Sequence, residues 1–144
     1  YTSHQRFIGC QQSFLEHDTV FVPEKSYEKA RFSYDSAYRG MKRLIARCPD
    51  ITAVFAMSDV MAIGAIRALR DLEYRVPEDV SVIGFDGITM SRYCVPVLTT
   101  VVQPSEQISL QSIELLVRQI EHGAPAQTIT LQPELQQGES VRAI

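Results

Sequence analysis

The sequence predicts an α/β fold with an open parallel sheet and flanking helices. Two apolar runs, Ile51–Met57 and Val80–Phe85, are rich in β-branched and aromatic residues. They barely alternate with polar residues, which is typical of strands buried on both faces. Between the runs, Met61–Leu72 shows apolar residues at helical spacing. Ser58 follows the first strand and Asp86 the second. Because ligands bind at the carboxyl ends of strands in such sheets, this edge is the predicted place of function.

The segments before this unit continue the alternation of helices and strands. A first helix is expected over Ser3–Leu15, with Ser3 as its cap. Thr19–Val22 is expected to be a short strand that ends at Pro23. Ser33–Arg47 has apolar residues along one helical face and is expected to be a helix.

The segments after the unit follow the same pattern. Leu98–Val102 is expected to be a strand. Pro104–Glu121 is expected to be a long helix, because proline suits a first helical turn and Gly123 suits its end. Thr128–Leu131 and Ser140–Ala143 are expected to be short closing strands.

Length and composition indicate one soluble globular unit. The 144 residues, 45% hydrophobic and 22% charged, can form one real core. The net charge of −3 argues against a nucleic-acid surface on this part of the protein. No apolar run approaches the roughly 20 residues of a membrane span, and no signal peptide is expected. The 3 scattered cysteines indicate free thiols in the cytoplasm.

Catalytic motifs are not evident in the sequence. Its 3 histidines are far apart, and it has no Gly-x-Ser-x-Gly elbow, phosphate loop or paired-cysteine site. We therefore expect no enzyme, no cofactor and no metal. A flavodoxin-like enzyme that binds phosphate remains an alternative.

Four segments carry a resemblance to a known family. They are Arg6–Gly9 (RFIG), Ala53–Ala65 (AVFAMSDVMAIGA), Val76–Asp86 (VPEDVSVIGFD) and Pro96–Pro104 (PVLTTVVQP). In order and spacing they resemble the lactose/galactose repressor (LacI/GalR) family. The resemblance spans nearly the whole chain and implies a periplasmic-binding-protein-like type I fold, with one subdomain and part of the other.

The resemblance also implies a domain organisation. Residues 1–98 would form the carboxyl-terminal effector-binding subdomain. Residues 99–126 would form a strand and helix that cross into the amino-terminal subdomain, and residues 127–144 would return. Operator DNA would be bound by a separate amino-terminal helix-turn-helix. The implied partners are a small-molecule effector, such as a sugar, and a second copy in a homodimer. A periplasmic sugar receptor of the same fold is the alternative function.

The resemblance assigns ligand-binding roles to Asp86 and to two further positions, Arg6 and Phe32. Asp86 matches an aspartate that contacts the effector, although a loop aspartate can also cap Ile88 or Thr89 through an Asx-turn. Arg6 matches an effector-binding arginine with a planar fork of donors, although a helical arginine can be merely solvated. Phe32 matches an aromatic residue that stacks on the effector, although it can also pack in the core, and Tyr34 competes for the role.

Ser58 departs from the family, which usually has asparagine there. Its hydroxyl can bind ligand or cap the next helix, and the cap is the favoured role over direct contact. Asp59 is expected to be structural and to bond first-turn amides. Glu73 replaces a glycine that often ends this helix, so it would be strained in a left-handed conformation.

Overall fold

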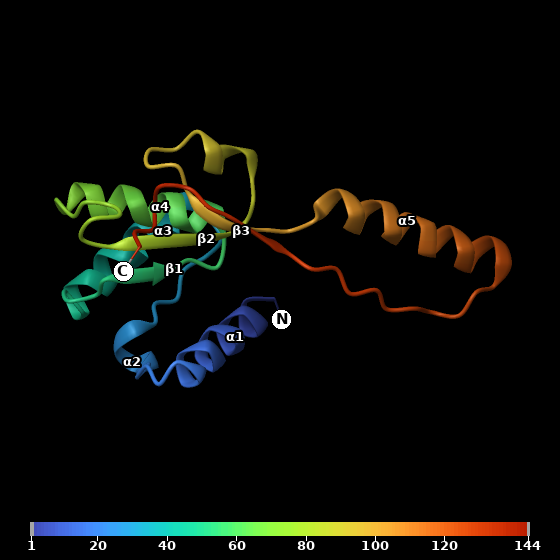
Figure 1. Ribbon diagram of the computed structural model, residues 1–144, viewed down its shortest axis with the longest axis horizontal. Coiled ribbons are helices and arrows are strands. Elements are labelled where there is room, and N and C mark those ends of the chain that lie inside the picture. The colour runs from blue at the N-terminus through green and yellow to red at the C-terminus, as the bar shows by residue number, and fades with distance from the viewer. Residues whose placement is uncertain (1, 144) are drawn as a thin grey trace.

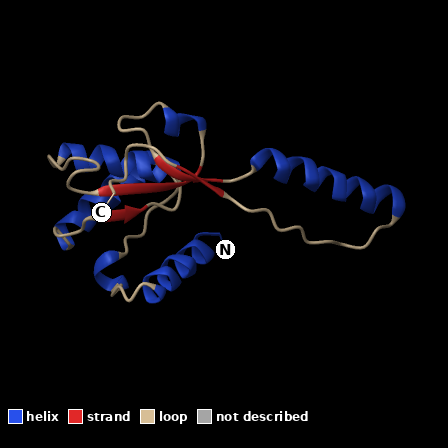
Figure 2. Cartoon of the chain, viewed as in Figure 1, coloured by secondary structure: helices blue, strands red, loops and turns tan. Residues whose placement is uncertain are grey.

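The computed structural model of the protein describes residues 2–143. Its centre is a 4-stranded sheet in the order β1-β2-β3-β4 (Figure 2). β1 (Ala53–Phe55), β2 (Ser81–Asp86) and β3 (Thr99–Val102) run parallel, and β4 (Glu134–Gln136) pairs antiparallel with β3. The predicted open sheet with flanking helices is therefore confirmed, with one antiparallel strand at its edge.

Two helices, α3 (Tyr34–Arg47) and α4 (Asp59–Asp71), pack together against one face of the sheet (Figure 1). The core lies between them and the strands. Its fully buried members include Leu69, Val82 and Leu98. The two helices approach closely at Gly64, where a Cβ atom would lie 2.4 Å from the Tyr34 carbonyl oxygen.

A third layer lies on the other side of β1. It contains α1 (Thr2–Glu16) and α2 (Pro23–Ser26), which are joined by a short loop (Figure 1). Aromatic rings hold this layer together. Phe7 packs on Tyr27 with ring centroids 4.8 Å apart, and Phe14 stacks on Phe21 at 5.0 Å.

One helix projects away from the rest of the molecule. β3 leads out of the sheet into α5 (Ser105–His122), and the following residues run back to β4 (Figure 1). We call residues 103–133 the arm. α5 has no buried residue. Its exposed large apolar side chains are Ile108, Leu110, Ile113, Leu116, Val117 and Ile120.

Two predicted strands are wrong. Thr19–Val22 is a loop that leads into α2, and Val20 is 86% exposed. A strand needs a partner for its backbone, and none pairs with this segment among residues 2–143. Thr128–Leu131 belongs to the returning arm, and the strand β4 forms only at Glu134–Gln136, where the chain reaches β3 again.

The last predicted strand, Ser140–Ala143, is also absent, although its first residue is buried. The Ser140 carbonyl oxygen accepts a hydrogen bond from the Val82 amide at 2.7 Å. The Ser140 hydroxyl donates to the Val82 carbonyl at 2.6 Å and accepts from the Thr99 amide at 2.8 Å. Side-chain and backbone bonds of one serine thus fix the end of the chain against the sheet.

Candidate functional site

Arg6 and Asp86 meet at the carboxyl edge of the sheet, although 80 residues separate them. Arg6 lies on α1, and its Nη2 donates to Asp86 Oδ1 at 3.2 Å. Its Nη1 donates to the carbonyl oxygen of Met57, which lies in the loop just after β1. One guanidinium therefore bridges the ends of two neighbouring strands, as its planar fork of donors allows.

A third group binds the same carboxylate. Gln103, at the base of the arm, donates from its side-chain Nε2 to Asp86 Oδ1 at 2.7 Å. Its backbone amide donates to the Asp86 carbonyl oxygen at 3.2 Å. Both side-chain contacts use Oδ1. Among residues 2–143, no hydrogen bond reaches Oδ2, so this oxygen is available to accept one from a ligand.

The site is partly open to solvent. The Arg6 side chain is 11% exposed and that of Asp86 is 28% exposed. The Arg6 guanidinium also lies over the ring of Phe85, 3.8 Å from its centroid, a contact that holds the guanidinium plane in place. Asp86 has a φ of 123°, which is uncommon for a residue with a side chain. Backbone strain of this kind concentrates at binding and catalytic sites.

Ser58 and Asp59 lie beneath this edge and are buried. The Ser58 hydroxyl accepts a hydrogen bond from the Met61 amide at 3.2 Å, so it caps α4 as expected. Asp59 is structural, but its partners differ from the expected first-turn amides. Its Oδ2 accepts from the amides of Gly87 and Ile88, both at 2.8 Å, and its Oδ1 accepts from the Thr100 hydroxyl.

Phe32 lies apart from the Arg6–Asp86 contact. Its side chain is 53% exposed and lines a groove beside β1, which neither Arg6 nor Asp86 lines. Tyr34, the competing aromatic residue, is 46% exposed at the start of α3. The structure thus brings Arg6 and Asp86 into contact, places Ser58 below them and leaves Phe32 in a different place.

Two contacts in this site were missed from the sequence. The Met57 carbonyl carries no signal in a sequence, because every residue has one. Gln103 does carry one, since it is the polar residue that follows β3, as Ser58 follows β1 and Asp86 ends β2. The rule that singled out the other two strand ends would have found it.

Burial affects the thiols of Cys10 and Cys94. Burial raises the pKa of the Cys10 thiol on α1, and burial likewise raises the pKa of Cys94 beyond its ordinary value. A raised pKa lowers the fraction of reactive thiolate at both positions. The site is suited to holding a polar molecule by hydrogen bonds.

Comparison with known proteins places this geometry in a family. The family of periplasmic binding protein-like domains matches residues 1–141. The chain is 38% identical over 144 residues to the HTH-type transcriptional repressor PurR of Mannheimia succiniciproducens, covering 99% of this chain and 43% of the relative. It is 45% identical over 120 residues to the HTH-type transcriptional regulator CelR of Thermobifida fusca, covering 81% of this chain and 34% of the relative.

A solved structure agrees with the sequence comparison. The complex of the transcriptional regulator CelR with cellobiose superposes with a TM-score of 0.89 at 34% identity, covering 94% of this chain and 41% of that one. The chain thus spans less than half the length of these relatives. It belongs to the periplasmic binding protein-like domain family, and its relatives there are LacI-type transcriptional regulators.

Proposed function

We propose that this chain is the effector-sensing part of a transcriptional regulator and binds a small polar ligand at the carboxyl edge of its sheet. The observation that carries the proposal is the bridge from Arg6 to Met57 and Asp86. It gathers charge-assisted donors and a free carboxylate oxygen at the edge where open sheets bind ligands. Ligand binding would also involve Ser58, which lies under this edge, and Phe32, whose ring is exposed.

A sugar is the proposed class of effector. Neighbouring hydroxyls of a sugar can donate to Asp86 Oδ2 and accept from the Arg6 fork. Relatives of known structure support this class, since one holds cellobiose, another lactose and another ribose.

We further propose the domain division expected from the sequence, with residues 1–98 as one subdomain, 99–126 as part of another and 127–144 as the return. The exposed apolar residues of α5 support it, because a large unpaired apolar surface requires a covering partner. The whole protein would act as a cytoplasmic homodimer. It would bind operator DNA through a separate helix-turn-helix domain, and it would not be an enzyme.

Effector binding would regulate DNA affinity by favouring one arrangement of the two subdomains. Gln103 supports this coupling, because it binds Asp86 and lies where the chain enters the arm. The relatives support a regulator over a periplasmic receptor, since those described above are transcriptional regulators. Among residues 2–143, no helix has the length and apolar character that a membrane crossing needs.

Calorimetry of the full-length protein tests the proposal. Cellobiose, ribose and a purine base serve as probes, with Asp86→Ala as the variant and the exposed Asp50→Ala as the matched control. Loss of the carboxylate should weaken binding by about 10- to 100-fold, the usual effect of hydrogen bonds to a charged group. Unchanged affinity in Asp86→Ala would exclude this site. A helix-turn-helix encoded upstream would support the regulator, whereas a signal peptide would support the periplasmic receptor.

A further inference from the structure

Positive charge gathers in one short segment of the chain. Residues 25–47 contain 7 of the 14 lysines and arginines but only 2 of the 17 acidic residues, so this segment carries a charge of +5. The rest of the chain therefore carries −8, since the whole carries −3. A net charge averages over both parts, and the surface formed by residues 25–47 is strongly positive.

Three of these arginines form a stripe along the exposed side of α3. Arg39, Arg43 and Arg47 follow one another at intervals of four residues, which places them on one side of the helix, about 6 Å apart along its axis. All three are exposed, whereas Met41 and Leu44 on the other side are buried in the core. Packing of the apolar side thus determines that the arginines face solvent.

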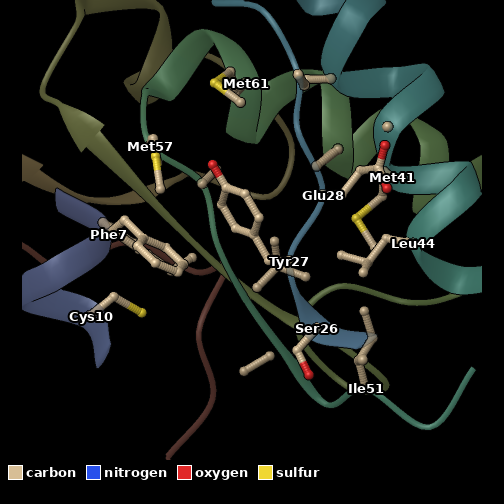
Figure 3. A pocket seen from close by; sticks show the side chains of 18 of the residues that line it. Phe7, Cys10, Ser26, Tyr27, Glu28, Met41, Leu44, Ile51, Met57 and Met61 are labelled. Carbon is tan, nitrogen blue, oxygen red and sulfur yellow. The ribbon is translucent and has the colours of Figure 1, made fainter. Parts of the chain in front are cut away.

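The segment before α3 lies against this stripe. The backbone that carries Tyr27 and Glu28 runs alongside α3, the helix of Met41 and Leu44 (Figure 3). Arg47 donates from Nε to the Lys25 carbonyl at 3.0 Å and from Nη2 to the Tyr27 carbonyl at 2.8 Å. The cations of this segment therefore extend the stripe. We call the six exposed cations the basic face: Lys25, Lys29, Arg31, Arg39, Arg43 and Arg47.

A single carboxylate offsets part of the charge of the basic face. Glu28 pairs with Arg43 at 2.7 Å and with Arg47 at 2.9 Å. Among residues 2–143, the other four cations of the basic face have no carboxylate within ion-pair distance. Arginines elsewhere, such as Arg67 and Arg75, each pair with an acidic residue four positions on. The basic face thus keeps most of its charge for an anionic partner.

We propose that the basic face binds the phosphate backbone of double-stranded DNA, independently of its sequence. The inference rests on the proposed function, because a regulator held at its operator meets neighbouring DNA at a high local concentration. Guanidinium forks match the geometry of phosphate groups. Each DNA strand carries a phosphate about every 3.4 Å along the helix axis. The stripe from Arg39 to Arg47, about 12 Å long, therefore spans about three of them.

The composition of the basic face favours DNA over an acidic protein. Interfaces between proteins are built around buried aromatic and aliphatic anchors. None of the exposed large apolar side chains among residues 2–143 lies within 25–31 or 39–47. Interfaces with DNA are instead polar and rich in positive charge. The acidic remainder of the chain is repelled by phosphates, so the molecule meets DNA in one orientation.

Fluorescence anisotropy of the 144-residue chain tests the proposal. The probe is a labelled duplex of about 20 base pairs with random sequence, titrated between about 50 and 200 mM salt. The variant Lys29→Gln/Arg31→Gln/Arg39→Gln removes three cations that have no ion-pair partner. The matched control removes the same charge elsewhere, at the exposed Arg67, Arg92 and Arg118. Thermal unfolding of both proteins shows whether they remain folded.

The salt dependence of binding is the decisive result. Each lost phosphate contact reduces the slope of log affinity against log salt by about 0.9, so the slope of the variant should be shallower by about 2–3. Its affinity at about 50 mM salt should fall by at least tenfold. The control should keep the slope of the unmodified chain within about 1. Amide shifts on adding DNA should fall within residues 25–47 and not in α5.

Three outcomes would overturn the proposal. They are absence of DNA binding at about 50 mM salt, equal slopes for the variant and its control, and binding of a poly-glutamate peptide as tight as that of DNA. The last outcome would assign the basic face to an acidic protein instead. None of these measurements uses an effector, so their failure and the failure of the proposed effector site are separate results.

Discussion

The buried carboxylate of Asp59 accepts a hydrogen bond from the amide of Gly87 at 2.8 Å and thereby connects the start of α4 with the loop after β2. The same Oδ2 accepts from Ile88 at 2.8 Å, and Oδ1 accepts from Thr100 on β3. Asp59 has no exposed surface. One side chain thus fixes three segments directly beneath Asp86, the proposed ligand residue.

Asp59→Ala is expected to lower the free energy of unfolding by about 3–5 kcal/mol, because it leaves two partly buried amides and one buried hydroxyl without partners. Urea denaturation measures the change, and Asp50→Ala, at an exposed position, is the control. A loss no larger than that of the control would show that water replaces the carboxylate.

Arg6→Lys is expected to weaken effector binding although it keeps the charge. A lysine ammonium cannot bridge the Met57 carbonyl and Asp86 with the fixed fork of a guanidinium, nor stack on Phe85 in the same way. We expect a loss of about tenfold or more in affinity for a sugar that binds the full-length protein, measured by calorimetry. Arg92→Lys, at an exposed position, is the control. Equal affinities of Arg6→Lys and the wild type would remove Arg6 from the site.

Glu73→Gly is expected to stabilise the protein. Glu73 follows α4 with a φ of 65°, the left-handed conformation in which the sequence predicted strain. Its amide donates to the Arg70 carbonyl and the Tyr74 amide donates to the Leu69 carbonyl, so the bonds that end the helix need this conformation. Glycine should raise the free energy of unfolding by about 0.5–1 kcal/mol. The control is Glu78→Gly, at an exposed position with an ordinary φ, which should lower the free energy of unfolding. If both variants stabilise the protein, the cause is the lost negative charge and not the left-handed conformation.

The pKa of Asp79 gives a pH-dependent prediction. Hydrogen bonds from the Arg75 side chain, and then from its amide, lower the pKa of Asp79 from 3.8 to about 2. A carboxyl with a lowered folded-state pKa stabilises the protein above its unfolded pKa, and this contribution is lost as the pH falls towards 2.

Carboxyl NMR titration of Arg75→Met measures this interaction. The midpoint of Asp79 should rise towards an ordinary value of about 4 but stay below it, because the backbone amide of residue 75 still donates to the carboxylate. The loss of stability below pH 4 should become shallower. Arg92→Met, at an exposed position, should leave the Asp79 midpoint near 2. A low midpoint in Arg75→Met would assign the shift to other groups.

Much of the fold could be predicted because local and tertiary preferences agree. The runs around β1 and β2 are apolar on both faces, and Ser33 and Ser58 are good caps that do begin α3 and α4. Thr19–Val22 has the composition of a strand, but a strand also requires a neighbour. Long-range pairing also decided the position of β4, which depends on where the returning arm meets β3.

The site was predictable to a similar extent. Arg6 and Asp86 were both expected to bind ligand, and the structure places them in contact across 80 residues. Polar residues at the carboxyl ends of parallel strands are candidate ligand residues. This rule identified Asp86, and it could also have identified Gln103. Phe32 could not be placed from the sequence, because the direction of an exposed ring in a loop depends on the surrounding packing.

The arm is attached to the sheet through two adjacent strands. β3 leads out and β4 leads back, and they are paired from Thr100 with Gln136 to Val102 with Glu134. A single tether would let α5 swivel in any direction, whereas a paired ribbon resists torsion and bends chiefly about one axis. A displacement of Gln103, at the base of the arm, would therefore move α5 mainly in one plane.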